Sequence, residues 1–168
     1  MSLTWSPKVA MSKAEIDSFL SKPLVARVAT IRDDGYPHVT PLWYHWDGEH
    51  LYLILGHGER PRHHIANLRR NDKVTLVIDK DVRPDTKTLF EAQAVSIRGR
   101  AELLTDEKTQ VDIVSKLLKR YGFGGAVKDV LEDGKPGKNR VIVKIKPEKI
   151  IAWNFEKLDS AYGSKKKG

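Results

Sequence analysis

Residues Val28–Leu55 read VATIRDDGYPHVTPLWYHWDGEHLYLIL, and this stretch decides the fold class. It contains three runs rich in β-branched and aromatic residues, separated by Asp33-Asp34-Gly35 and by Asp47-Gly48. Asp-Gly pairs between such runs are typical of tight β-hairpin turns. Two hairpins in succession indicate an antiparallel meander, because the parallel sheet of an α/β fold needs long crossover connections.

The remaining sequence extends this sheet and adds helices. The pattern predicts strands over residues 24–32, 36–46, 51–55, 74–78, 89–104, 141–145 and 150–155, the last two separated around Pro147. Gly99 is expected at a bulge or a close backbone approach. Three helices are expected over about residues 12–22, 61–70 and 105–121, the first opened by a Ser12–Glu15 capping box. Strands this continuous in sequence favour a mainly β fold with flanking helices, closed or nearly closed into a barrel that leaves no exposed edges.

Composition limits the class of protein. The chain has 168 residues, a length that suits one domain, and we expect a single domain over residues 1–168 with an N-terminal extension at 1–11 and a flexible basic tail at 157–168. It has no cysteine, which excludes disulfides and thiolate chemistry and suits a reducing, cytoplasmic compartment. No apolar run is long enough for a membrane span or a signal core. The net charge of +8 favours anionic partners, although part of it lies in the terminal lysines.

A basic segment, Gly56–Arg70, is the strongest functional signal. It holds four arginines and three histidines in fifteen residues and joins the end of a strand to the start of a helix. A helix N-terminus offers unpaired N–H groups, and guanidinium groups bind phosphate in a bidentate manner. We therefore expect this segment to bind a phosphate group, with a solvated basic helix face as the alternative. A metal site is not expected, because the arginines would repel a cation.

A second candidate lies on the strand containing Thr40, Pro41, Leu42, Trp43 and Tyr44. Proline inside a strand marks an edge or a bulge, where backbone donors and acceptors are available to the rim of a heterocycle. The nearby aromatic side chains, including Trp46, could stack on a flat ring, and ordinary barrel packing is the alternative.

In this order the motifs resemble the flavin-binding split-barrel family typified by pyridoxamine 5'-phosphate oxidase. The resemblance rests on Ala29-Thr30, Asp34-Gly35, Pro37, Pro41, Trp46-Asp47-Gly48 and Asn67-Leu68-Arg69-Arg70-Asn71, followed by Arg98-Gly99-Arg100-Ala101-Glu102. About 50 residues match well and the rest weakly. The resemblance implies a six-stranded split barrel and a homodimer with FMN bound at the dimer interface.

The resemblance also implies roles for individual residues. The strand Thr40–Tyr44 would line the isoalloxazine ring and ribityl chain, and Leu55 and Gly56 would approach the flavin from the next strand. Phosphate binding would fall to the basic turn, and Gln93 and Trp153 would come from the partner subunit. The basic turn here comprises Arg60, Arg62, His63 and His64, with Asn67 following in the helix.

One departure from the family pattern concerns the phosphate. The family usually has Ser-x-Lys three residues before the position of Asn67, and this chain has Arg62-His63-His64. Histidine is mostly neutral near pH 7 and holds phosphate less firmly than lysine does. A deazaflavin coenzyme or haem is therefore an alternative to FMN. No arginine-containing substrate signature follows Trp153, which argues against oxidation of vitamin B6.

The sequence leaves the activity open between classes. The first hypothesis is an FMN-dependent oxidoreductase acting on a small molecule of unknown identity, with no catalytic acid or base identified in the chain. The second is a flavin, deazaflavin or haem carrier or sensor without turnover. A nucleic-acid-binding barrel is the third and weakest, since the charge alone supports it.

Overall fold

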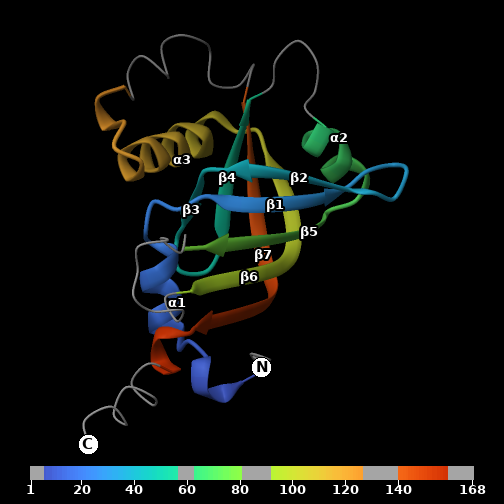
Figure 1. The fold of residues 1–168 in the computed structure, drawn as a ribbon. Helices are drawn as coiled ribbons and strands as arrows, with labels where there is room; N and C mark the ends of the chain where they lie inside the picture. Colours follow the sequence, from blue (N-terminus) through green and yellow to red (C-terminus); the bar gives the residue numbers. More distant parts are fainter. Residues whose placement is uncertain (1–5, 57–62, 81–91, 127–139, 159–168) are drawn as a thin grey trace, which may run out of the picture.

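The computed structural model describes residues 6–56, 63–80, 92–126 and 140–158. Within them an antiparallel sheet is flanked by three α-helices and two short 3-10 turns (Figure 1). The helices and turns are η1 (Pro7–Val9), α1 (Lys13–Leu20), α2 (His63–Arg70), α3 (Glu107–Arg120) and η2 (Gly124–Ala126). The strands are β1 (Ala26–Ile31), β2 (Pro37–Leu42), β3 (Tyr44–Trp46), β4 (Leu51–Gly56), β5 (Lys73–Asp79), β6 (Gln93–Leu104) and β7 (Arg140–Asn154).

The sheet is curled, and its two edges are neighbours in sequence. The described strands follow the order β2-β1-β5-β6-β7-β4-β3, so β2 and β3 form opposite edges. Only Trp43 separates these two strands along the chain, which brings the edges together and closes the sheet into a split barrel (Figure 1). The antiparallel, mainly β fold is confirmed. The described residues form seven strands, against the six that the resemblance implies. The run expected over 36–46 is divided at Trp43, and the runs expected over 141–145 and 150–155 form one strand.

The division has a local cause. Pro41 has no N–H to donate to a ladder, and the N–H of Tyr44 donates to the Tyr121 hydroxyl at 3.2 Å instead of to a strand. Beyond Trp43 the chain pairs with β4, where Tyr44 faces Leu53. The same chain therefore leaves β1 and joins β4 within one residue.

The expected break at Pro147 is wrong, because β7 runs unbroken through it. Pro147 faces Gly99 of β6 at the one register shift between the two strands. A proline is tolerated at such a bulge because no ladder hydrogen bond is lost there. Gly99 is placed as expected, since a Cβ at this position would lie 2.3 Å from the Lys146 carbonyl oxygen.

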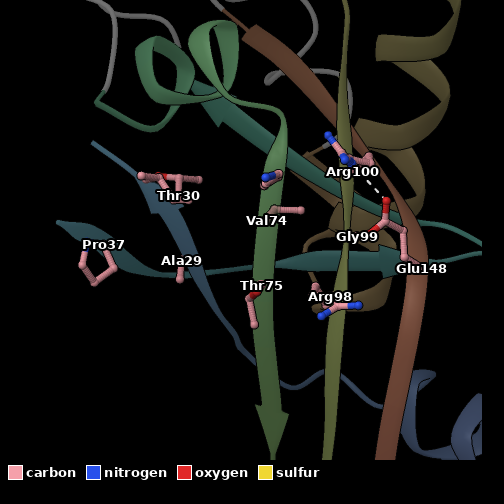
Figure 2. Close-up of a pocket in the computed structure, with 11 residues that line it drawn as sticks. Ala29, Thr30, Pro37, Val74, Thr75, Arg98, Gly99, Arg100 and Glu148 are labelled. Carbon is pink, nitrogen blue, oxygen red and sulfur yellow. Dashed lines mark hydrogen bonds and ion pairs between the residues drawn. The ribbon is translucent and has the colours of Figure 1, made fainter. Parts of the chain in front are cut away.

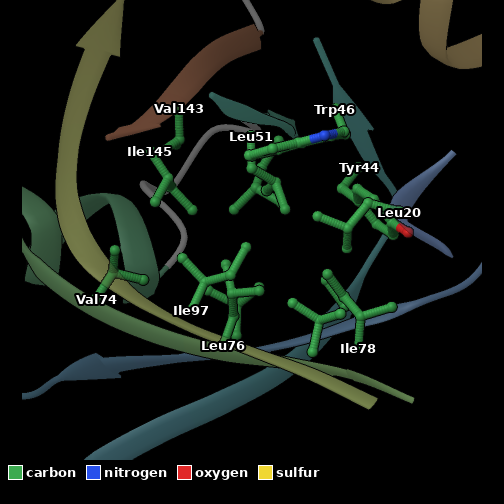
Figure 3. Close-up of a cluster of buried hydrophobic side chains, with 14 of the residues drawn as sticks. Leu20, Tyr44, Trp46, Leu51, Val74, Leu76, Ile78, Ile97, Val143 and Ile145 are labelled. Atoms are coloured by element: carbon green, nitrogen blue, oxygen red, sulfur yellow. The ribbon is translucent and has the colours of Figure 1, made fainter. Parts of the chain in front are cut away.

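The hydrophobic core fills the inside of the curled sheet. Alternating residues of six strands point inward, among them Leu51, Leu76 and Ile97 (Figure 3). Helix α1 contributes Ile16, Phe19 and Leu20 to this core, and the Ser12–Glu15 capping box that starts the helix is confirmed.

Helix α2 contributes Ile65 and Leu68 to the same core. Helix α3 packs outside the barrel, where Ile113 and Val114 contact Ile142 of β7 in a second apolar cluster. None of the helices in the described ranges is both long and apolar enough to cross a lipid bilayer.

Candidate functional site

The far edge of β2 is the backbone feature around which the site is built. Strand β2 pairs with β1 along residues Pro37–Leu42, and no described strand pairs with its other edge. In an antiparallel ladder, alternate residues direct their N–H and C=O groups away from the partner strand. Because β2 is an edge strand, these outward groups are available to a ligand, except at the prolines, which have no N–H.

Three histidines meet at the first part of this strand, and we call them the histidine cluster. The His38 ring of β2 lies 5.6 Å from the His63 ring and 5.7 Å from the His64 ring, centroid to centroid. His64 is buried and His63 is exposed at the start of α2. The His38 Nε2 is 3.1 Å from the hydroxyl of Thr40 on the same face of the strand. No group of three or more His, Cys, Asp or Glu among the described residues could hold a metal ion.

Helix α2 is fixed against the barrel by Asn67. The Asn67 side-chain amide donates to the Thr30 hydroxyl at 2.9 Å, and both side chains are buried. Its carbonyl oxygen accepts a hydrogen bond from Arg70 at 3.1 Å. The Asn67 amide group therefore holds α2 to β1 through Thr30, and its carbonyl oxygen is hydrogen-bonded within α2. The contact with β1 positions His63 and His64 beside β2.

An apolar cavity of about 360 Å³ lies at the other end of β2, where the strand turns into β3. It is bounded by the β2–β3 corner, by β4, by the inner side of α3 and by the first residue of β7. The lining residues are Pro41, Leu42, Trp43, Ile54, Val114, Leu117, Leu118 and Arg140. We call this the apolar cavity. Three of the predicted site residues, Pro41, Leu42 and Trp43, thus share one cavity with a helix that the sequence did not implicate.

The histidine cluster and the apolar cavity are joined by β2. His38 and Trp43 are five residues apart, which corresponds to about 17 Å along an extended strand. In Figure 1, β2 runs from the side of α2 toward α3. The strand therefore offers basic side chains at one end, a polar backbone edge in the middle and apolar surface at the other end.

Some of the predicted site residues can offer only backbone groups to this site, because their side chains are buried. The side chains of Tyr44, Trp46 and Leu55 are buried in the core, with Tyr44 0% and Leu55 1% exposed. The stacking role expected for Tyr44 and Trp46 is therefore wrong, because barrel packing has taken both rings. Trp43, at 41% exposure, is the aromatic side chain of the 43–46 stretch that remains accessible to a ring.

Gln93 and Trp153 lie at the far end of the sheet from the histidine cluster. In the β6–β7 ladder Gln93 faces Asn154 and Ala94 faces Trp153, so the two predicted side chains point to opposite faces. Gln93 borders a shallow pocket beside α1, and Trp153 forms a bridge with Ala10. Within one chain neither approaches β2, and their contribution to a partner's site stays a prediction. Arg60 and Arg62 lie outside the described residues.

Titratable groups next to the apolar cavity have structural roles. The Arg120 guanidinium lies 4.4 Å from the Tyr44 ring and donates to the carbonyls of Leu20 and Lys22. Burial raises the pKa of the Tyr44 phenol. Burial also lowers the pKa of His45, and the positive charges of Arg120 and Lys116 add to this effect. His45 is therefore neutral at physiological pH and is unsuited to binding a phosphate as a cation.

A second cavity, of about 470 Å³, opens on β1, β5, β6 and β7 and reaches Pro37 of β2 (Figure 2). We call it the outer basic cavity. Lys73, Arg98 and Arg100 line it with Glu148, and Arg100 is paired with Asp72 at 2.7 Å and with Glu148 at 3.0 Å. None of the predicted cofactor positions lines this cavity.

Sequence comparison assigns the family. The chain matches the family described as pyridoxamine 5'-phosphate oxidase over residues 12–154. It belongs to the pyridoxamine 5'-phosphate oxidase family. The matched residues include β2, the histidine cluster and every residue that lines the apolar cavity. A search of the curated proteins found no match.

The solved structures that are similar to this chain include an F420 reductase and a haem storage protein. The chain is 27% identical to a conserved hypothetical protein from Mycobacterium tuberculosis, with 91% of each chain covered and a TM-score of 0.75. It is 26% identical to an F420 reductase, covering 80% of this chain and 94% of that one, with a TM-score of 0.55. HutZ, a haem storage protein from Vibrio cholerae, is 20% identical over 83% of this chain and 93% of that one, with a TM-score of 0.64, and at this identity it shows the fold alone.

Two features of the site were missed by sequence reasoning. His38 was read only as part of a strand, and its period-two alternation with Thr40 was the available signal that both face the same way. The helix expected over about residues 105–121 was given no role in a site, although its apolar residues recur at helical spacing. A helical apolar stripe does not reveal whether it meets a core or borders a cavity.

Proposed function

We propose that this protein is an FMN-dependent oxidoreductase that acts on a small molecule. Membership of the pyridoxamine 5'-phosphate oxidase family over residues 12–154 carries the proposal. A bound flavin supplies the redox chemistry itself, by hydride transfer, and the protein supplies binding, orientation and electrostatics. The absence of cysteine from the sequence suits a reducing compartment and supports a cytoplasmic location.

The residues along β2 fit such a cofactor. His63 and His64 would hold the phosphate with Arg60 and Arg62, and His38 lies within 6 Å of both histidine rings, so we add it to this set. The outward backbone groups of β2 near Thr40 would meet the polar rim of the ring system. Leu42, Trp43 and the outward side of Gly56 would provide its apolar surroundings.

A deazaflavin is the second candidate, favoured by the 26% identity to an F420 reductase over 94% of that chain. Coenzyme F420 is a deazaflavin that also carries a phosphate group, so the same basic residues could hold either cofactor. His64, where the resemblance leads us to expect a family lysine, is compatible with this change of cofactor.

We also propose that the protein is a homodimer whose partner covers the outer face of β1 and β2. Val39 and Ile31 are 58% and 38% exposed on these strands, and Tyr36, in the turn before β2, is 72% exposed. Ile31 also lines the outer basic cavity. Exposed apolar side chains grouped on a sheet face commonly mark a protein–protein contact. Gln93 and Trp153 would then reach the site of the partner. Light scattering should give a dimer for the native protein and a monomer for Val39→Lys.

The function is tested by titrating the cofactor-free protein with FMN, riboflavin, coenzyme F420 and haemin. We expect FMN or F420 to bind with a shifted visible spectrum, FMN more tightly than riboflavin, and the loaded protein to be reduced by NADH or NADPH or to reduce an added acceptor. Binding of a flavin without any turnover would instead establish a carrier. Binding of haemin alone would refute the flavin assignment.

A further inference from the structure

We propose that the apolar cavity binds the second reactant and that this reactant is a flat, predominantly uncharged aromatic molecule. The proposal rests on the proposed function for the role of the ligand as a reactant. The chemical class of the ligand follows from the cavity itself. It depends on the size of the cavity, its charge, its aromatic wall and its position relative to the edge of β2.

The cavity has the size of a small-molecule site. Its volume of about 360 Å³ falls in the range of pockets that take drug-sized ligands. Val114 and Leu117 of α3 line it and are 2% and 3% exposed, so the helix side of the cavity is a closed apolar wall. Leu42 and Ile54 complete the opposite wall from β2 and β4.

The charge of the cavity argues against a multiply charged ligand. Arg140 is the one charged side chain among its described lining residues, and the other seven residues are apolar. On the same helix, Asp112 and Lys116 neutralise each other across 2.7 Å. A phosphate placed here would be taken out of water with little compensation, which is costly. The basic residues that suit a phosphate lie at the other end of β2.

The aromatic wall favours a flat ligand. The Trp43 ring is stacked on Tyr121, with centroids 4.6 Å apart and planes inclined by 8°, and on Phe123 at 5.3 Å and 22°. Tyr121 is held in place because its hydroxyl accepts from the Tyr44 N–H and donates to the Leu24 carbonyl. Since Trp43 remains 41% exposed, a fixed aromatic surface is available to an incoming ring.

The position of the cavity separates this ligand from the cofactor ring. A flavin or deazaflavin ring has a pyrimidine rim that needs hydrogen-bond partners, and leaving such groups unpaired in an apolar site is expensive. Those partners are the outward backbone groups of β2 near Thr40, whereas Pro41 at the cavity has no N–H. The cavity adjoins the cofactor strand at Leu42 and Trp43 and would bring a second ring beside it.

The test uses calorimetric titration of the whole protein with three matched probes: 2-naphthol, 2-naphthyl phosphate and cyclohexanol. We expect 2-naphthol to bind at least about tenfold more tightly than either of the others, because one lacks the flat ring and the other adds a desolvated charge. Equal or tighter binding of naphthyl phosphate or cyclohexanol would overturn the proposed class.

Two variants of α3 locate the binding. Leu118→Glu places a charge in the cavity and should weaken 2-naphthol binding at least about tenfold, with FMN affinity unchanged. Val111→Glu, two turns earlier, half-buried like Leu118 and outside the lining, should leave both affinities unchanged. Naphthol binding that survives Leu118→Glu would refute the site. If this variant does not fold, Leu118→Gln replaces it, with the same expected direction for naphthol affinity and for FMN affinity.

Competition distinguishes this proposal from the proposed function. If the cavity holds the second reactant, saturating FMN or F420 should leave 2-naphthol affinity within about threefold of its value in the cofactor-free protein. Loss of naphthol binding in the presence of cofactor would show that the cavity belongs to the cofactor ring, and would overturn the inference while leaving the proposed function intact. Naphthol binding in a protein that takes neither flavin nor deazaflavin would support the ligand class and refute the proposed function.

Discussion

The side-chain amide of Asn67 donates a hydrogen bond to the hydroxyl of Thr30 over 2.9 Å, between helix α2 and strand β1. The two side chains are 3% and 1% exposed, so water cannot replace either partner. Through this contact, the family motif around Asn67 fixes the position of the two histidines four and three residues before it. Asn67 therefore positions the histidine cluster, and the hydrogen bonds of its side-chain amide are already taken up in doing so.

Replacing Asn67 by alanine should destabilise the protein by about 1–3 kcal/mol, because the buried Thr30 hydroxyl loses its partner. Urea unfolding measures this change. In a double-mutant cycle, Thr30→Val should cost less in the Asn67→Ala background than in the native protein. Additive effects of the two substitutions would contradict a direct coupling.

Gly99→Ala should lower the free energy of unfolding by about 1–3 kcal/mol, since the new methyl group would overlap the Lys146 carbonyl oxygen and push β6 and β7 apart. The matched control is Gly125→Ala, because nothing lies within 4 Å of a Cβ at that position. The control should change stability by less than about 1 kcal/mol. Equal effects in thermal or urea unfolding would rule out the close approach.

Tyr121→Phe should destabilise the protein by about 1–3 kcal/mol, because the Tyr44 N–H and the Leu24 carbonyl both lose the same hydroxyl partner. The Tyr36 ring is 72% exposed, so Tyr36→Phe provides a control expected to stay within about 0.5 kcal/mol. Chemical denaturation of both variants separates the two cases. A Tyr121→Phe variant as stable as this control would show that the hydroxyl is dispensable.

The stabilising charge on Glu15 should be lost in acid. The hydrogen bond from Lys157, followed by the backbone N–H of Ser12, lowers the pKa of Glu15 from 4.5 to about 2. A carboxyl whose pKa is lower in the folded state stabilises the protein above its unfolded pKa, and this contribution disappears as pH falls from about 4.5 toward 2. Unfolding measured from pH 7 to pH 2.5 should show Glu15→Gln less stable at neutral pH, by under about 1 kcal/mol for so exposed a pair. The difference should narrow in acid, and a constant or growing difference would contradict the assignment.

His38→Ala should weaken binding of FMN and leave binding of riboflavin unchanged, because we propose that the histidine cluster binds the phosphate, which riboflavin lacks. The expected loss is severalfold, in keeping with one hydrogen bond to a charged group among several. Fluorescence titration with both flavins provides the measurement. His50→Ala, at the opposite end of β4, serves as the control and should alter neither affinity. An equal loss for both flavins would place His38 at the ring instead of the phosphate.

The hairpins and caps could be predicted because their signals are local. Gly35 and Gly48 adopt φ values of 84° and 101°, as tight turns after aspartate require, and Asp106 caps α3 through the Thr109 N–H. The curl of the sheet could not be predicted in the same way. The curl determines that β2 ends before Trp43, that His38 lies beside α2 and that α3 lines a cavity. All three features depend on contacts between residues that are distant in sequence.

The dependence on contacts between distant residues also explains the predictions that are wrong. Pro147 resembles a strand end in the sequence, and only the register shift opposite Gly99 shows why the strand continues. Tyr44 and Trp46 carry the ring shape suited to stacking, but their alternation directs both into the core. Residue type indicated what these side chains could do, and the inward or outward direction of each strand position determined which of them reach a ligand.

The single residue between β2 and β3 has a mechanical consequence. Before Trp43 the chain is paired with β1, and after Trp43 it is paired with β4. Trp43 is therefore the vertex from which β2 and β4 diverge. A flavin held along β2 as proposed would have its phosphate beside His38, and the vertex at Trp43 would set how far the cofactor can extend toward β3.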